Sequence, residues 1–204
     1  TASNNTAVGY QALYANTTGS ENLAFGYQAL DANTSGTNNI GIEYAAVGAN
    51  TTGIHNIGIG SNSGALASNT TGSYNVALGN DALKSNTTAG QSTAVGYQAG
   101  YSVTTGEKNT TLGSSAGRSI TVGYGNVFVG NGSGFNTTGN GNTFVGGSTA
   151  GSYFPSGYYM TTGSGNTIIG GFNGNEGGLD IRTSSNNIVL SDGDGTPRMY
   201  FAAG

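Results

Sequence analysis

The chain has 204 residues, of which 39 are glycine and only 7% are charged, and its net charge is −4. Five Lys and Arg residues are too few for a nucleic-acid surface, and the absence of Cys excludes disulfides, thiolate catalysis and Cys zinc sites. No apolar run approaches the ~18 residues of a membrane span, so we predict neither a nucleic-acid partner nor membrane insertion. No signal-peptide pattern follows Thr1. With only 36 Leu, Ile, Val and Phe, the chain needs a source of order other than a thick apolar core.

One short pattern recurs along the chain: Asn, an apolar residue or Thr, a small residue, an apolar residue and usually Gly. It begins as Asn5-Thr6-Ala7-Val8-Gly9, and its copies are separated by 17, 17, 17, 19, 17, 17, 17, 16, 24 and 21 residues. Ser92 holds the first position in one copy. The structural-repeat asparagines that hold it in the others are Asn5, Asn22, Asn39, Asn56, Asn75, Asn109, Asn126, Asn142, Asn166 and Asn187.

A second segment and a turn complete the early units, as in Tyr10-Gln11-Ala12-Leu13 followed by Asn16-Thr17-Thr18-Gly19. We predict two strands of about five residues and two tight bends in each unit. This unit is too short for a strand-helix-strand crossover, so the units stack with equivalent strands paired in parallel. The predicted fold class is therefore all-β, a parallel β-roll or β-solenoid of ~17-residue coils.

The small middle residue of each pattern points away from its two apolar neighbours, because strand side chains alternate. This indicates close approach by another backbone. One thin coil has few large apolar residues, so we expect a homotrimeric fibre that buries the small-residue face around a threefold axis. Sequence alone leaves the number of chains open. The stacked Asn residues predict either amide ladders along the axis or bonds within local turns.

Three regions follow from the regularity of the repeat. Residues 1–117 form regular repeats, residues 118–184 form degenerate repeats with irregular insertions, and residues 185–204 form a C-terminal β-hairpin or cap around an Asp-Gly turn. Phe128, Phe144 and Ile168 replace the small middle residue, which predicts a changed cross-section in the second region.

The pattern Asn-x-Ala-Val-Gly-Tyr-Gln-Ala-Leu, with its later Asn-Thr-Thr-Gly, resembles the YadA-like head repeats of trimeric autotransporter adhesins. It resembles still more closely the variants of that repeat in bacteriophage tail fibres. The resemblance covers residues 4–117 well and 118–170 loosely, although this repeat is longer than the usual adhesin-head unit. It implies a left-handed β-roll in a homotrimer. Residues 186–201 resemble the segment before an endosialidase-type chaperone that cleaves itself off, so Gly204 could be a processed end.

Candidate binding residues lie in the insertion that lengthens one unit to 24 residues, because loops inserted on solenoids often bind ligands. They are Tyr153, Phe154, Tyr158 and Tyr159. Four tyrosines also recur at one repeat position and form either a structural stack or a sugar-binding ladder: Tyr10, Tyr27, Tyr44 and Tyr97.

Catalytic and metal patterns are weak. Glu176 and Asp180 could act as the acid and base of a glycosidase, and Asp192 and Asp194 could bind calcium, although a hairpin turn explains the second pair better. His55 is the only histidine, which rules out a His cluster. We therefore predict no catalytic residue, no metal and no cofactor.

The predicted function is that of a structural and receptor-binding segment of an extracellular trimeric fibre, namely a bacteriophage tail fibre that attaches to the host surface. Its expected partners are its own copies, a bacterial surface receptor (a glycan or an outer-membrane protein) and other virion tail proteins. The alternatives are a bacterial surface adhesin of the autotransporter type, a tailspike-type glycan hydrolase and a purely structural spacer.

Overall fold

The computed structural model describes residues 2–61, 63–147 and 155–202, and these contain strands and turns but no helix. A three-residue strand forms at each of the first ten repeat patterns, and four further strands complete the chain. The strands are β1 (Thr6–Val8), β2 (Leu23–Phe25), β3 (Ile40–Ile42), β4 (Ile57–Ile59), β5 (Val76–Leu78), β6 (Thr93–Val95), β7 (Thr110–Leu112), β8 (Val127–Val129), β9 (Thr143–Val145), β10 (Thr167–Ile169), β11 (Asn175–Glu176), β12 (Leu179–Asp180), β13 (Ile188–Ser191) and β14 (Pro197–Phe201).

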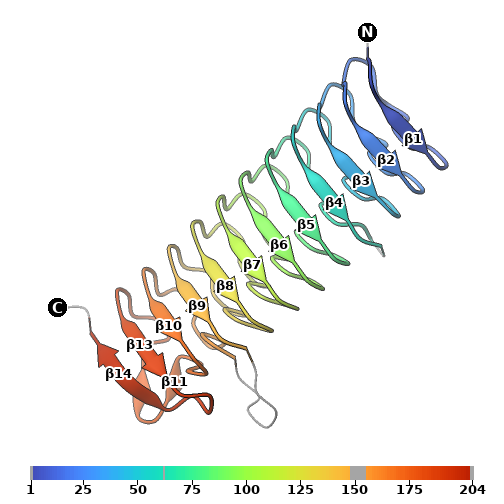
Figure 1. Cartoon of the computed structure of the whole chain (residues 1–204). Coiled ribbons are helices and arrows are strands. Elements are labelled where there is room, and N and C mark those ends of the chain that lie inside the picture. Colours follow the sequence, from blue (N-terminus) through green and yellow to red (C-terminus); the bar gives the residue numbers. More distant parts are fainter. Residues whose placement is uncertain (1, 62, 148–154, 203–204) are drawn as a thin grey trace.

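Coils stack along one axis, with the two chain termini at opposite ends (Figure 1). Strands β1 to β10 and then β13 pair in parallel in chain order, and each pairing aligns the same repeat position, as for Thr6 with Leu23 and Val8 with Phe25. Strand β14 pairs antiparallel with β13 to form the hairpin at the end of the sheet. The predicted fold class, an all-β parallel solenoid with a repeat near 17 residues, is confirmed.

The second predicted strand in each coil is wrong. The segment after each strand is a series of turns, in which Gln11 and Leu13 adopt positive φ values of 55° and 52°. Its backbone still bonds to the next coil, because the Leu13 N–H donates to the Ala29 carbonyl at 3.1 Å and the Ala15 N–H donates to the Asp31 carbonyl at 2.9 Å. These bonds between coils stabilise a left-handed backbone that non-glycine residues otherwise adopt rarely.

The small middle residues lie inside the chain's own coil, which corrects the expectation that they face a threefold axis. Ala24, Ala77 and Ala94 are fully buried in the monomer. Small residues are needed here because the turn segment crosses close to the strand: a Cβ on Gly41 would lie 2.7 Å from the Ala46 carbonyl oxygen and 3.2 Å from the Leu30 side chain. The backbone that approaches is therefore the chain's own.

The bulky middle residues are accommodated within the coil, which gives a physical reason other than a widened fibre. Phe128 is fully buried, and its ring stacks on that of Phe144 with centroids 5.0 Å apart. The turn residue six positions later is Gly134, where earlier coils carry a leucine such as Leu30 six positions after Ala24. A Cβ on Gly134 would lie 2.7 Å from Phe128, so the glycine makes room for the ring. The parallel register continues unbroken through β7, β8 and β9.

The repeat asparagines form a ladder along the axis. The backbone N–H of Asn22 donates to Asn5 Oδ1 at 2.9 Å, while its own Nδ2 donates to the Gly36 carbonyl at 2.9 Å. The same pair of contacts recurs along the stack, and Ser92 Oγ replaces the acceptor in one coil. At the last strand, Asn187 Oδ1 accepts from the Tyr200 hydroxyl at 2.9 Å.

The turn asparagines form a second ladder, and here both sequence-based alternatives occur together. Asn33 Nδ2 donates to Asn16 Oδ1 at 3.0 Å along the axis and to the Gly36 carbonyl within its own turn at 3.0 Å. The ladder ends at Asn86, whose buried Oδ1 has no hydrogen-bond partner, because Val103 occupies the next position.

Candidate functional site

The outward side of the parallel sheet carries an exposed apolar surface, which we call the outer face. It consists of the first and third residues of each parallel strand, since the middle residue points inward. The third position is apolar in every one of these strands, and Val8, Phe25 and Ile169 are 49%, 53% and 47% exposed. Met199 and Phe201 continue this surface on β14, because they pair with Leu190 and Ile188.

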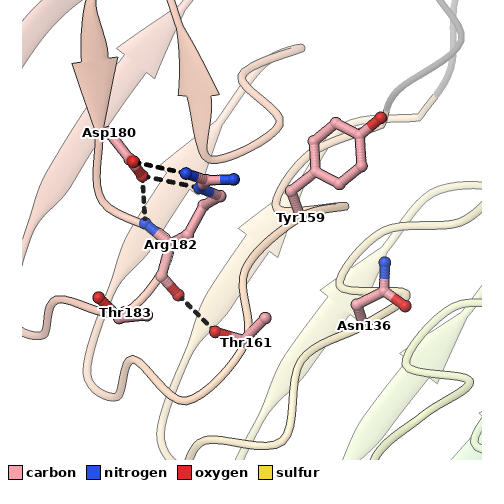
Figure 2. A pocket seen from close by; sticks show the side chains of 6 residues that line it. All are labelled: Asn136, Tyr159, Thr161, Asp180, Arg182 and Thr183. Atoms are coloured by element: carbon pink, nitrogen blue, oxygen red, sulfur yellow. Dashed lines mark hydrogen bonds and ion pairs between the residues drawn. The ribbon is translucent and has the colours of Figure 1, made fainter.

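A pocket of about 350 Å³ lies on the C-terminal coils (Figure 2). Its lining comes from three consecutive coils, because the Asn136 backbone bonds to the Tyr158 carbonyl and the Thr161 N–H bonds to the Arg182 carbonyl. The aromatic ring of Tyr159 lies across the pocket from an Asp–Arg ion pair (Figure 2). The lining residues are Asn136, Tyr159, Thr161, Asp180, Arg182 and Thr183.

The ion pair in this pocket has planar, two-point geometry. Arg182 donates from Nε to Asp180 Oδ1 at 2.9 Å and from Nη2 to Asp180 Oδ2 at 2.8 Å, and its backbone N–H donates to Oδ1 at 3.1 Å. The side-chain hydrogen bond from Arg182 holds the pKa of Asp180 below its ordinary value, and the same contact raises the pKa of Arg182. Both side chains are nearly half exposed.

The predicted binding aromatics divide into two groups. Tyr153 and Phe154 lie outside the described residues, so their surroundings stay a prediction. Tyr159 lines the pocket, and Tyr158 lies beside it, with the two rings edge to face at 5.2 Å. The structure therefore brings Tyr159 together with Asp180, which sequence analysis had paired with Glu176 instead.

Sequence analysis missed a column of cations and aromatic rings that leads to this pocket. The Arg118 guanidinium lies between two rings, 5.2 Å from the Tyr101 centroid and 5.5 Å from the Phe135 centroid. Lys84 Nζ lies 5.5 Å from the other side of Tyr101, and Phe135 stacks on Tyr158 at 5.0 Å. The signal was the spacing of these residues, at 17, 17, 17 and 23 positions, which matches the repeat.

The recurring tyrosines form a stack in the first coils. Tyr27 lies between Tyr10 and Tyr44, with centroids 5.2 Å apart on each side. Because the neighbouring rings cover both faces of Tyr27, this ring has no face left for a sugar. Tyr97, at the same repeat position, is 50% exposed.

The two carboxylates of the possible glycosidase pair lie on opposite faces of a hairpin. Strands β11 and β12 pair Glu176 with Leu179 and Asn175 with Asp180. Directly paired residues share a face and successive residues alternate, so Glu176 and Asp180 point in opposite directions. In addition, a carboxyl whose pKa is lowered by Arg182 is unsuited to donate a proton as a general acid.

The Asp-Gly turn forms the hairpin between β13 and β14. Asp192 Oδ1 accepts from the backbone N–H groups of Asp194 and Thr196, and Asp192 Oδ2 accepts from Arg198 at 2.6 Å. These bonds occupy the carboxylate that a calcium ion would need. Among the described residues no group of three His, Cys, Asp or Glu side chains could hold a metal ion. His55 lies at a bend and stacks on Tyr74 at 5.0 Å.

Comparison of the chain with protein-family models, curated proteins and solved structures gives no significant match. In the part of the chain that the structure describes, no helix is long and apolar enough to cross a membrane.

Proposed function

We propose that the chain is a segment of a homotrimeric extracellular fibre that attaches to a bacterial surface receptor, and that the fibre is a bacteriophage tail fibre. The observation that carries this proposal is the outer face, because a soluble monomer rarely exposes a contiguous apolar strip over its whole length. Copies of the chain would cover each other's outer faces, in place of the small-residue faces first expected. The number three comes from the resemblance to trimeric fibre repeats.

The pocket supports the receptor-binding part of the proposal. It lies on coils whose units are lengthened by insertions, and its lining combines one aromatic ring with several polar side chains. Three copies around an axis would present three such pockets, so that weak individual contacts add up to strong attachment. We assign the fibre no catalytic role, because Glu176 and Asp180 point in opposite directions. A bacterial surface adhesin of the autotransporter type would use the same outer face and the same pocket.

Light scattering of the purified chain tests the assembly. The wild type is expected at three times the monomer mass of 20.2 kDa. A variant with Phe25→Glu, Val95→Glu and Ile169→Glu is expected to run as a monomer, because charges on the outer face cannot be buried without partners. These side chains are exposed in the single chain, so the coil itself should still fold.

A matched control places three glutamates on exposed side chains away from the outer face, through Tyr14→Glu, Tyr74→Glu and Val122→Glu. This variant is expected to keep the wild-type mass. A wild-type chain that runs as a monomer would overturn the proposed fibre. Attachment is tested separately, by binding of the fluorescently labelled trimer to a panel of bacterial strains, and no binding to any strain would favour a spacer.

A further inference from the structure

We propose that the pocket between Tyr159 and the Asp180–Arg182 pair binds a neutral saccharide. This inference rests on the proposed receptor-binding function and names the ligand class of its site.

The size and composition of the pocket fit a short saccharide. Its volume of about 350 Å³ lies at the lower end of the ~300–1,000 Å³ typical of ligand pockets. One wall is the Tyr159 ring, whose apolar face can pack against the C–H groups of a sugar ring (Figure 2). The other walls are amide, hydroxyl, carboxylate and guanidinium groups, which bind hydroxyls in defined directions.

The charges of the pocket favour a neutral ligand over an anionic one. Arg182 is its only cationic side chain, and Asp180 neutralises it through two short hydrogen bonds. Because the pKa of Asp180 is lowered, the carboxylate stays ionised and would repel a carboxylate or phosphate that approached Arg182. A sugar hydroxyl can donate to one member of the pair and accept from the other without breaking it.

Hydrogen-bonding capacity remains on the groups that line the pocket. Asp180 Oδ2 accepts one bond from Arg182, which leaves a lone pair for a hydroxyl donor. The Arg182 guanidinium has further N–H groups beyond those that contact Asp180. Asn136 Nδ2 is held by the Tyr158 carbonyl at 3.0 Å, which fixes the amide and keeps its Oδ1 as an acceptor.

Saturation-transfer NMR and titration with simple sugars test the proposal on the whole chain. The probes are the methyl glycosides of glucose, galactose, mannose, rhamnose and N-acetylglucosamine, with glucuronic acid and sialic acid as anionic comparators. At least one neutral probe is expected to bind. Arg182→Gln and Tyr159→Ala are each expected to weaken that binding at least about tenfold, since each removes a principal contact.

Two matched controls separate loss of the site from a general defect. Arg198→Gln breaks the equivalent exposed Asp–Arg pair in the β13–β14 hairpin, and Tyr124→Ala removes a ring that is 59% exposed elsewhere. Both should bind like the wild type. The proposal is overturned if no neutral probe binds, if only the anionic sugars bind, or if the pocket variants bind as tightly as the controls.

The ligand class and the proposed function can fail separately. If labelled trimer attaches to bacteria, but no neutral sugar binds and Arg182→Gln attaches like the wild type, the saccharide proposal fails while the fibre stands. If the chain is monomeric and attaches to no strain, the fibre itself fails.

Discussion

Asn50 Nδ2 donates a 2.7 Å hydrogen bond to Asn33 Oδ1, although 17 residues separate the two side chains along the sequence. Both asparagines are fully buried, and each also donates to a glycine carbonyl in its own turn. One side chain thus closes a bend and joins two coils. This double role explains how a chain with little large apolar content keeps its bends in register.

The turn ladder predicts that Asn50→Asp destabilises the chain strongly. The carboxylate cannot donate to Asn33 Oδ1 or to the Gly53 carbonyl, and it is buried without a cation. We expect a loss of about 2–4 kcal/mol in the free energy of unfolding, measured by urea denaturation. Asn131→Asp, at an exposed turn position, is the control and should unfold like the wild type. Equal losses in the two variants would contradict a structural role for the ladder.

The interior predicts that Phe128 and Gly134 compensate each other in volume. Phe128→Ala should lower the free energy of unfolding by about 3–5 kcal/mol, because the ring is fully buried. Adding Gly134→Leu should recover at least about 1 kcal/mol, since it restores the pairing of Ala24 with Leu30. Leu30 itself has a φ of 52°, so this backbone accepts leucine.

Gly134→Leu alone is the control for this pair. It should destabilise the chain, because its Cβ would meet the Phe128 ring. A double variant whose loss equals the sum of the two single losses would refute the compensation.

The Arg118 column predicts a stabilising cation between two rings. Arg118→Gln should lower the free energy of unfolding by about 1–2 kcal/mol, since it removes contacts with both Tyr101 and Phe135. Arg118→Lys should lose less, because it keeps the charge. Arg198→Gln, whose guanidinium forms an exposed ion pair, should have little effect on urea denaturation. A larger loss in the Arg198 variant would argue against the column.

The Asp180–Arg182 pair predicts a pH dependence that NMR can measure. A carboxyl titration should give Asp180 a pKa below 3.8, because Arg182 stabilises the carboxylate in the folded chain. The pair therefore contributes above the pKa of the unfolded chain and is lost as the pH falls through the lowered value. Arg182→Gln should raise the pKa of Asp180 toward 3.8, while Asp192, held by Arg198, should keep its lowered pKa. An unchanged Asp180 titration in that variant would disprove the coupling.

The pocket was only partly predictable from the sequence. Tyr159 drew attention because aromatic residues gather in an insertion that breaks the repeat. Asn136 and Arg182 did not, because 46 residues separate them and only the stacking of insertion-lengthened coils brings them to one pocket. Asp180 was noticed as an acid, but its partner was misassigned, because the β11–β12 hairpin that turns it away from Glu176 has no strong sequence signal.

The sequence by itself determined the stacking. A period near 17 with Asn, Gly and apolar residues at fixed positions leaves parallel coils as the compact solution, since parallel strands in register align identical residues. Only the tertiary structure decided which side of each strand faces inward and what crosses behind it. Those choices depend on turns such as Gln11 to Leu13, where bonds to the next coil hold non-glycine residues at positive φ. Local propensity disfavours that conformation, so the inner position of the small residues and the exposure of the apolar ones emerge only when the coils pack.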